Sequence, residues 1–191
     1  MVEIKDQPTD GELVERVLAG EHDAFQPLME RYQQPLFGYL YRLNGRDPDA
    51  AADLLQSVFL KAFQSLSKYD ASRPFSPWLY RIAHNEAANN FRSHSRKPTV
   101  SLDDTTNDTL SDKANDPEQT EAEAQESTAL RKAVDQLPDN QKAAVMLHYF
   151  EERSYEEVAE ILGVRLGTVG TLLNRARGRL AEQLAALGEG K

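Results

Sequence analysis

Apolar residues recur at steps of three and four along most of this chain, and no stretch of it alternates at a step of two. The clearest run comprises Phe25, Leu28, Met29, Tyr32, Leu36, Leu40 and Leu43. Such spacing places side chains on one face of a helix, whereas a half-buried strand requires strict alternation. The sequence therefore predicts an all-α protein without a sheet. Pro35 interrupts the run and should kink this helix or mark a break in it.

The helical pattern stops in residues 101–128, which contain nine acidic residues and one basic residue. Only two leucines in this segment are large and apolar. A segment of this composition buries too little surface to offset the entropy lost on ordering. We therefore expect an acidic flexible linker at 98–127 between two small helical domains, at 1–97 and 128–191.

Several classes of protein are excluded by what the sequence lacks. The chain has no cysteine, which excludes a disulfide framework, a thiolate zinc site, an iron–sulfur cluster and a cysteine nucleophile. Its four histidines are scattered, and no phosphate-binding glycine loop or serine-hydrolase motif occurs. No apolar run approaches the roughly 18 residues of a membrane helix, and the N-terminus lacks the pattern of a secretory signal. We expect a cytoplasmic protein with no catalytic site, no metal or cofactor and no membrane insertion.

The net charge of −9 argues at first against a nucleic-acid partner. The acidic residues, however, are concentrated in residues 101–128, whose net charge is −8. Residues 73–97 contain five basic residues and one acidic residue, and residues 161–181 contain four arginines and no acidic residue. Because both stretches are locally basic, nucleic acid remains a candidate partner for each domain.

Residues 154–180 have the layout of a helix-turn-helix. Ser154 and Glu157 form a capping box that starts a short helix, and Gly163 is placed to end it. The longer helix that follows offers threonine and asparagine, which can read base edges, and arginine, which can read guanine or hold phosphate. The candidate DNA-binding residues are Arg165, Thr168, Thr171, Asn174, Arg175 and Arg177. The alternative is a plain helical hairpin with a solvated basic face.

A second candidate nucleic-acid surface lies on the predicted helix after Pro77. Within an arc of roughly 80° on this helix, four residues form a polar stripe, namely Arg81, Asn85, Asn89 and Arg92. Asparagine has a poor helix propensity, so two of them on one exposed stripe suggest a use. Phe75 and Trp78 come just before the stripe, and aromatic rings can stack on unpaired bases. The alternative is that these two aromatic residues belong to the core.

A further predicted helix has apolar residues on nearly all of its own sides, namely Leu54, Leu55, Val58, Phe59, Ala62, Phe63 and Leu66. Asp53, Gln56 and Lys61 are its polar exceptions. A helix of this kind is either deeply buried or shared with a partner. The pattern alone does not choose between the two.

These features together resemble bacterial RNA polymerase sigma factors of the extracytoplasmic-function group, within the sigma-70 family. The resemblance covers roughly residues 10–97 and 126–185. It depends on the order and spacing of several segments: DLLQSVFLKAF at 53–63, YDASRPFSPWLYRIAHN at 69–85, Leu137-Pro138, GVRLGTV at 163–169 and NRAR at 174–177. It implies two helical domains that dock on core RNA polymerase and recognise promoter DNA.

The resemblance also implies a role for each candidate surface. Phe75, Trp78 and the polar stripe would recognise and melt the −10 element, and the helix-turn-helix would read the −35 element. Members of the family are usually held inactive by an anti-sigma partner. The contact with the polymerase clamp would be carried by Asp53, Leu54, Gln56, Phe59 and Leu60.

The sequence departs from the family at Gly170 and Leu172, where basic residues are common. A glycine inside the recognition helix lowers helix propensity by about 1 kcal/mol, and both positions lose a possible phosphate contact. We therefore expect a −35 interaction that is weaker or differently tuned.

The predicted function is that of a transcription initiation factor that binds core RNA polymerase and directs it to promoters. The main alternative is a one-component helix-turn-helix regulator that binds duplex DNA alone. That alternative would leave the polar stripe and the aromatic residues before it without a task. A small all-α enzyme and a helical adaptor that binds only proteins are the remaining alternatives.

Overall fold

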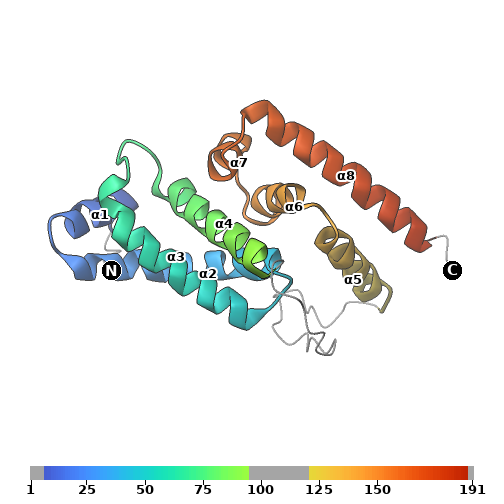
Figure 1. Cartoon of the computed structure of the whole chain (residues 1–191), viewed down its shortest axis with the longest axis horizontal. Helices are drawn as coiled ribbons and strands as arrows, with labels where there is room; N and C mark the ends of the chain where they lie inside the picture. Colours follow the sequence, from blue (N-terminus) through green and yellow to red (C-terminus); the bar gives the residue numbers. More distant parts are fainter. Residues whose placement is uncertain (1–6, 95–120, 189–191) are drawn as a thin grey trace, which may run out of the picture.

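The computed structural model describes residues 7–94 and 121–188, and every element within these ranges is helical (Figure 1). This confirms the prediction of an all-α protein. The N-terminal half contains α1 (Asp10–Leu18), α2 (Phe25–Leu43), α3 (Pro48–Ser65) and α4 (Phe75–His94). The C-terminal half contains α5 (Glu121–Asp135), α6 (Asp139–Val145), α7 (Tyr155–Leu162) and α8 (Leu166–Gly188). Shorter turns are η1 (His22–Ala24), η2 (Leu66–Lys68) and η3 (Met146–Phe150), the last of them π-helical.

Capping boxes start α1 and α7, the second of them as predicted. The Thr9 side chain accepts a hydrogen bond from the Glu12 backbone N–H, and the Glu12 carboxylate accepts one from the Thr9 backbone. Ser154 and Glu157 repeat this arrangement at the start of α7. Gly163 ends α7 with a φ of 65°, a left-handed conformation that glycine adopts without steric cost. Local side-chain chemistry therefore sets the ends of these helices.

A break at Pro35, one of the two outcomes predicted for this residue, is wrong. The α2 helix continues through Pro35 from Phe25 to Leu43. The residues that follow it, Leu36, Tyr39 and Leu40, are fully buried. Burial of this apolar stripe offsets the backbone hydrogen bond that proline cannot donate.

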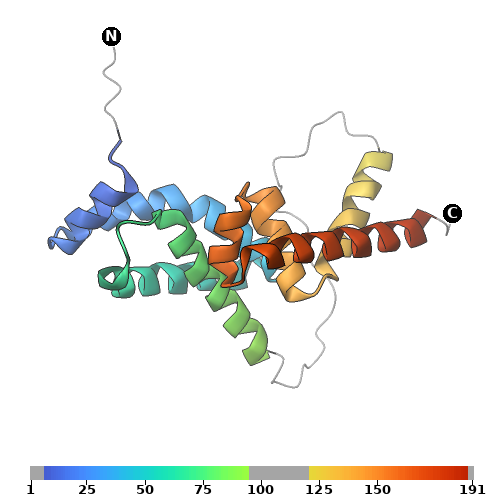
Figure 2. The same cartoon turned by 90° about the horizontal axis from the view of Figure 1, so that it is seen from above.

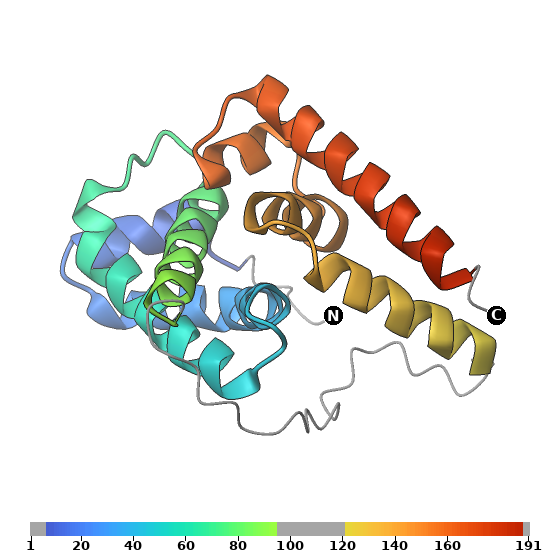
Figure 3. The same ribbon diagram turned by 45° about the vertical axis from the view of Figure 1, so that its right-hand side comes forward.

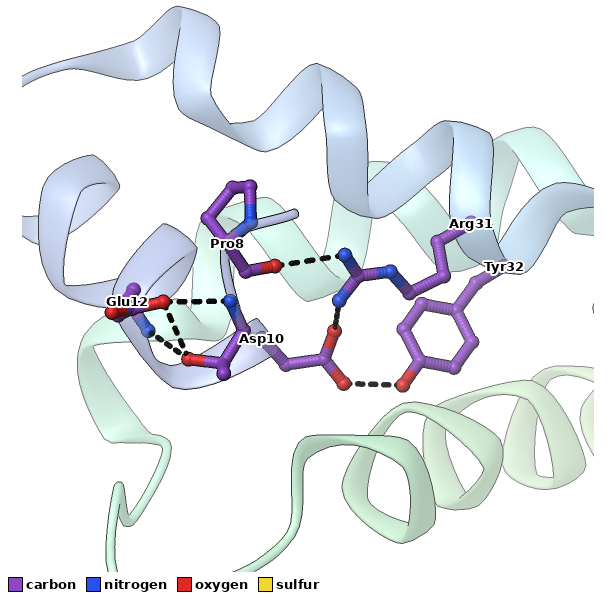
Figure 4. Close-up of polar contacts among 6 residues, drawn as sticks. Pro8, Asp10, Glu12, Arg31 and Tyr32 are labelled. Atoms are coloured by element: carbon purple, nitrogen blue, oxygen red, sulfur yellow. Dashed lines mark hydrogen bonds and ion pairs between the residues drawn. The ribbon is translucent and has the colours of Figure 1, made fainter. Parts of the chain in front are cut away.

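The first helix is fixed to the second by a polar cluster (Figure 4). The Asp10 carboxylate accepts hydrogen bonds from the Arg31 guanidinium and from the Tyr32 hydroxyl. Arg31 also donates through Nη2 to the Pro8 carbonyl at 2.9 Å. Burial, with the neighbouring Asp10 carboxylate, raises the pKa of Tyr32 well above its ordinary value, so this hydroxyl remains a hydrogen-bond donor.

In the C-terminal half, α6 is the central helix. It packs against α8 and α7, and α5 packs against α8, so that α5 and α8 flank α6 in Figure 3. The helical segment that begins at Asp139 extends to Phe150, with its last turn in π-helical form.

The two halves pack directly against each other. Helix α7 packs against α4 and lies next to it in Figures 1 and 2, and the buried apolar residues of both halves form one continuous cluster. Most of the predicted linker at 98–127 lies outside the described residues. Its last part is helical, because α5 begins at Glu121.

Candidate nucleic-acid and protein interfaces

An apolar hollow of about 690 Å³ lies between α2 and α3, and we call it the α2–α3 groove. Its most exposed apolar side chains are Leu60 (59 % exposed), Phe63 and Met29. Phe25 lies beneath them, with its ring in edge contact with the Phe63 ring at 5.2 Å between centroids. Large apolar side chains that stay exposed around a hollow mark a surface for a partner.

The residues that the family resemblance assigned to polymerase binding lie at different depths. Gln56, Phe59 and Leu60 line the groove, although Phe59 is only 6 % exposed. Asp53 is exposed and lies seven residues before Leu60, which places both on the same face of α3. Leu54 is buried and does not line the groove.

The sequence-based analysis missed the second wall of the groove. This wall comes from η1 and α2, and its residues are His22, Asp23, Phe25, Gln26, Met29 and Gln33. Met29 already stood on the apolar stripe of the predicted helix. Only the packing of α2 on α3 reveals that this methionine stays exposed at the groove instead of entering the core.

The polar stripe on α4 borders a second hollow, of about 370 Å³, which we call the α4 hollow. Arg81, Asn85 and Trp78 line it, together with Lys68 from the turn before α4. Asn89 is exposed further along α4. Arg92 belongs to α4, but its side chain lies outside the described residues.

Phe75 and Trp78 differ in burial. Phe75 is 3 % exposed, and its ring lies 5.5 Å from the Tyr69 ring and 5.7 Å from the Tyr32 ring. For Phe75 the structure therefore supports the core alternative over contact with bases. Trp78 is half-buried, and its ring is 5.4 Å from the Phe75 ring. The buried Phe75 thus supports a tryptophan that lines the α4 hollow.

Helix α8 and the residue before it bury their apolar side chains and expose the candidate DNA-binding side chains. Val169, Leu173 and Ala176 are buried. All six candidate DNA-binding residues of this segment are exposed, namely Arg165, Thr168, Thr171, Asn174, Arg175 and Arg177. Helix α8 forms an outer edge of the molecule (Figure 1).

Two contacts organise this outer face of α8. The Arg177 guanidinium donates to the Asn174 side-chain oxygen, and the Thr171 hydroxyl donates to the Gly167 carbonyl at 3.2 Å. A side chain built onto Gly170 would meet only the Tyr155 ring, at 3.9 Å. The glycine at this position is therefore not required by close packing.

Among the residues that the structure describes, no group of three or more histidine and acidic side chains is placed to hold a metal ion. Within the same ranges, no helix has both the length and the apolar character needed to cross a membrane.

Comparisons with known proteins identify the family. The family model described as Sigma-70 region 2 matches residues 28–97, and that described as Sigma-70, region 4 matches residues 127–180. The first range contains most of the residues that line the two hollows. The lining residues outside it are His22, Asp23, Phe25 and Gln26 of the groove and Glu160 of the α4 hollow. The second range contains the outer face of α8. The ECF RNA polymerase sigma-E factor of Haemophilus influenzae is 34 % identical over 188 residues, which cover 95 % of this chain and 98 % of that protein.

Two solved structures share the fold. CnrH, in complex with the cytosolic domain of CnrY, matches with a TM-score of 0.68 and 22 % identity, covering 93 % of this chain and 97 % of CnrH. The sigma factor RpoE of Bartonella quintana, in complex with the anti-sigma factor NepR, matches with a TM-score of 0.63 and 23 % identity over 85 % of this chain and 98 % of RpoE. The family matches and the sequence identity agree, and this chain belongs to the extracytoplasmic-function group of sigma-70 RNA polymerase sigma factors, which are transcription initiation factors.

Proposed function

We propose that three surfaces of this transcription initiation factor divide its work. The α2–α3 groove binds core RNA polymerase, the α4 hollow and stripe recognise and melt the −10 element, and the outer face of α8 reads the −35 element. The observation that carries this division is the contrast in chemistry between an exposed apolar groove and two exposed polar helix faces. The polymerase supplies the catalysis, and the factor works with it in the cytoplasm.

The groove suits a protein partner. Leu60, Phe63 and Met29 together offer apolar surface whose removal from water favours association with a partner. Asp53 lies beside this surface on α3 and would pair with a basic residue of the partner. Phe59 lines the groove although it is buried, whereas the buried Leu54 would act only through the packing of α3.

The α4 hollow suits unpaired DNA. Lys68 and Arg81 provide positive charge, Asn85 provides both a donor and an acceptor, and Trp78 provides an aromatic ring. Stacking of a base on an aromatic ring contributes about 1–3 kcal/mol and requires a base that has left the duplex. A surface of this kind stabilises the melted state of the −10 element more than its duplex state.

The outer face of α8 suits duplex DNA. Its threonine, asparagine and arginine side chains are exposed on the second helix of a helix-turn-helix, the helix that enters the major groove in this motif. Arg175 and Asn174 are the best placed for base edges by type, because their side chains form paired hydrogen bonds with guanine and adenine.

An anti-sigma factor is the other proposed partner. The sigma factor RpoE was solved in complex with one. The α2–α3 groove is the surface we assign to it, because a protein that covers Leu60 and Phe63 excludes the polymerase from the same residues.

A transcription assay tests the proposal. Purified bacterial core polymerase would be incubated with a pool of promoter fragments, with and without this protein. Transcripts that depend on the protein and start downstream of a shared pair of sequence elements are expected. Absence of transcripts together with tight duplex binding by the protein alone would favour the one-component regulator.

Variants assign the surfaces within the same assay. Arg81→Ala or Asn85→Ala should impair promoter opening more than polymerase binding, whereas Asp53→Ala should do the reverse. Permanganate reactivity of unpaired thymines reports opening, and native gel electrophoresis reports polymerase binding. A pattern in which all three variants lose polymerase binding equally would contradict the assignment.

A further inference from the structure

A row of aromatic rings leads from α2 to the α4 hollow. The centroid of the Tyr32 ring lies 5.7 Å from that of the Phe75 ring, and the Phe75 centroid lies 5.4 Å from that of the Trp78 ring. Tyr69, from the segment between η2 and α4, lies beside the Phe75 and Trp78 rings, at 5.5 and 5.2 Å. We call these four residues the aromatic row. Tyr69 and Trp78 line the α4 hollow, whereas Phe75 and Tyr32 are buried behind them.

Neighbouring rings of the row constrain one another's orientation. The interplanar angle is 58° between Tyr32 and Phe75 and 41° between Phe75 and Trp78. Aromatic pairs prefer such tilted arrangements to face-to-face stacking, and a close-packed interior leaves little room for one ring to turn alone. Phe75 and Trp78 also lie on successive turns of α4. The placement of Trp78 at the hollow therefore depends on Phe75 and, through Phe75, on Tyr32.

A carboxylate of α1 anchors the far end of the aromatic row. Asp10 accepts a hydrogen bond from the Tyr32 hydroxyl on one oxygen and from the Arg31 guanidinium on the other (Figure 4). Because both oxygens are engaged, the carboxylate is held in one orientation, and hydrogen bonds to a charged group are stronger than neutral ones. Asp10 is the first residue of α1, where negative charge also stabilises the helix. The Tyr32 ring is therefore fixed from a helix that lies outside the α4 hollow.

We propose that Asp10 is a positioning residue for −10 recognition: its carboxylate holds the Tyr32 ring, and the aromatic row holds the Trp78 ring in place for an unpaired base. The proposal rests on the assignment of the α4 hollow to the −10 element. A ring that is already in place loses less conformational entropy when a base stacks on it. Asp10 lies outside residues 28–97, which match the Sigma-70 region 2 model, so the proposal extends the −10 machinery to the first helix of the chain.

The fluorescence of Trp78 tests the positioning directly, because Trp78 is the only tryptophan of the chain. Asp10→Ala removes the anchor, and Tyr32→Phe removes the hydroxyl but keeps the ring. Both variants should increase the quenching of Trp78 by acrylamide and shift its emission to longer wavelength. Glu15→Ala, which removes an exposed carboxylate from the same helix, is the matched control and should behave as the wild type does. Unchanged quenching in both Asp10→Ala and Tyr32→Phe would overturn the proposal.

A double variant separates positioning from a loss of stability. Asp10→Ala and Tyr32→Phe remove the same hydrogen bond, so their combination should raise the quenching no further than Asp10→Ala alone. Circular dichroism gives the melting temperature of each variant, and quenching is measured well below the lowest of these temperatures. A purely stabilising contact would lower the melting temperature and leave the quenching unchanged. Additive effects on quenching would show that Asp10 does not act through Tyr32 and would overturn the proposal.

Promoter opening by the holoenzyme tests the functional consequence. With core polymerase and a promoter that the wild type opens, Asp10→Ala and Tyr32→Phe should lower permanganate reactivity by about fivefold, because a displaced ring loses part of its stacking on the base. Binding to core polymerase should stay at the wild-type level, since neither residue lines the α2–α3 groove. Opening at the wild-type level in both variants would overturn the proposal.

The two measurements distinguish two kinds of failure. If the wild type opens no promoter, the proposed function fails and the −10 role of Asp10 fails with it, although quenching still shows whether Asp10 holds Trp78. If the wild type opens promoters and both variants match it, the role of Asp10 fails and the proposed function stands.

Discussion

The α2–α3 groove and the outer face of α8 are both exposed, but they offer opposite chemistry to a partner. The groove is hollow and apolar, with Leu60 and Phe63 left in contact with water. The face of α8 is convex and carries arginine, threonine and asparagine. An apolar hollow stabilises a complex through buried area, whereas a polar face works through hydrogen bonds and charge, which carry sequence information. Under the proposed assignment, polymerase binding and −35 recognition lie in separate halves of the chain, whereas −10 recognition shares the N-terminal half with the groove.

The largest expected effect comes from a charge in the groove. Leu60→Asp should weaken binding to core polymerase by about 2 kcal/mol or more, because an exposed apolar contact becomes a desolvated carboxylate. Competition for fluorescently labelled core polymerase measures the loss. Leu18→Asp is the matched control, since Leu18 is 50 % exposed and lies outside the groove. Equal losses of polymerase binding in both variants would show that the groove is not the surface that binds the polymerase.

The next effect concerns the face of α8. Arg175→Ala should weaken binding to a promoter fragment by about 1–3 kcal/mol if the guanidinium makes a paired contact with a guanine. Fluorescence anisotropy with the −35 duplex and with a scrambled duplex measures this change. Polymerase binding should stay at the wild-type level. An equal loss on both duplexes would assign Arg175 to phosphate and sharpen the comparison by removing one base-reading residue.

A smaller effect is expected from Gly170→Ala within the same helix. Alanine raises helix propensity by about 1 kcal/mol, and the added methyl group meets only the Tyr155 ring at an ordinary contact distance of 3.9 Å. Thermal denaturation should shift upward by about 2–4 °C. If the variant competes for core polymerase as well as the wild type does, the gain in thermal stability arises in the C-terminal half. A lower melting temperature would show that this glycine has a packing role.

The smallest effect is a dependence of stability on pH in the N-terminal half. Burial lowers the pKa of His84, whose Nδ1 lies 3.2 Å from the Tyr39 hydroxyl. Below the unfolded pKa of about 6.5, the unfolded chain binds a proton that the folded chain binds less readily. The free energy of unfolding should therefore fall as the pH is lowered from about 6.5, by at most ~1.4 kcal/mol per pH unit for one proton.

Urea denaturation at about pH 7.5 and 5.5 measures this slope. The His84→Gln variant should have a shallower pH dependence than the wild type. His22→Gln, in an exposed position, controls for the loss of a histidine. Parallel profiles for the wild type and His84→Gln would remove His84 as the cause.

Local features of this fold were predictable from the sequence, and features created by distant contacts were not. The capping boxes at Thr9 and Ser154 and the glycine that ends α7 depend on neighbours within a few residues. The exposed face of α8 follows from helical periodicity alone. Phe75 and Trp78 are three residues apart and both lie beside the Tyr69 ring, but Phe75 also lies beside the Tyr32 ring of the distant α2 and is the more deeply buried of the two.

The contact between the halves lay beyond any local pattern. Arg42 and Glu151, which are hydrogen-bonded across this contact, are 109 residues apart, and neither belongs to a recognisable motif. The same holds for the second wall of the groove, where Met29 and Phe25 come from α2 and the other wall from α3. A helical stripe predicts which side chains leave solvent, but it does not predict which of them remain at the rim of a hollow.

The π-helical turn at Met146–Phe150 has a consequence for how such a contact arises and disappears in evolution. The Glu151 backbone N–H donates to the Met146 carbonyl at 3.1 Å, five residues back, so the turn holds one residue more than an α-helical turn. Deleting one residue here would restore α-helical spacing and rotate Glu151 by about 100° around the helix axis. The loss of a single codon would thus turn the Glu151 carboxylate away from the Tyr80 hydroxyl, to which it is hydrogen-bonded, without any amino-acid substitution at this contact.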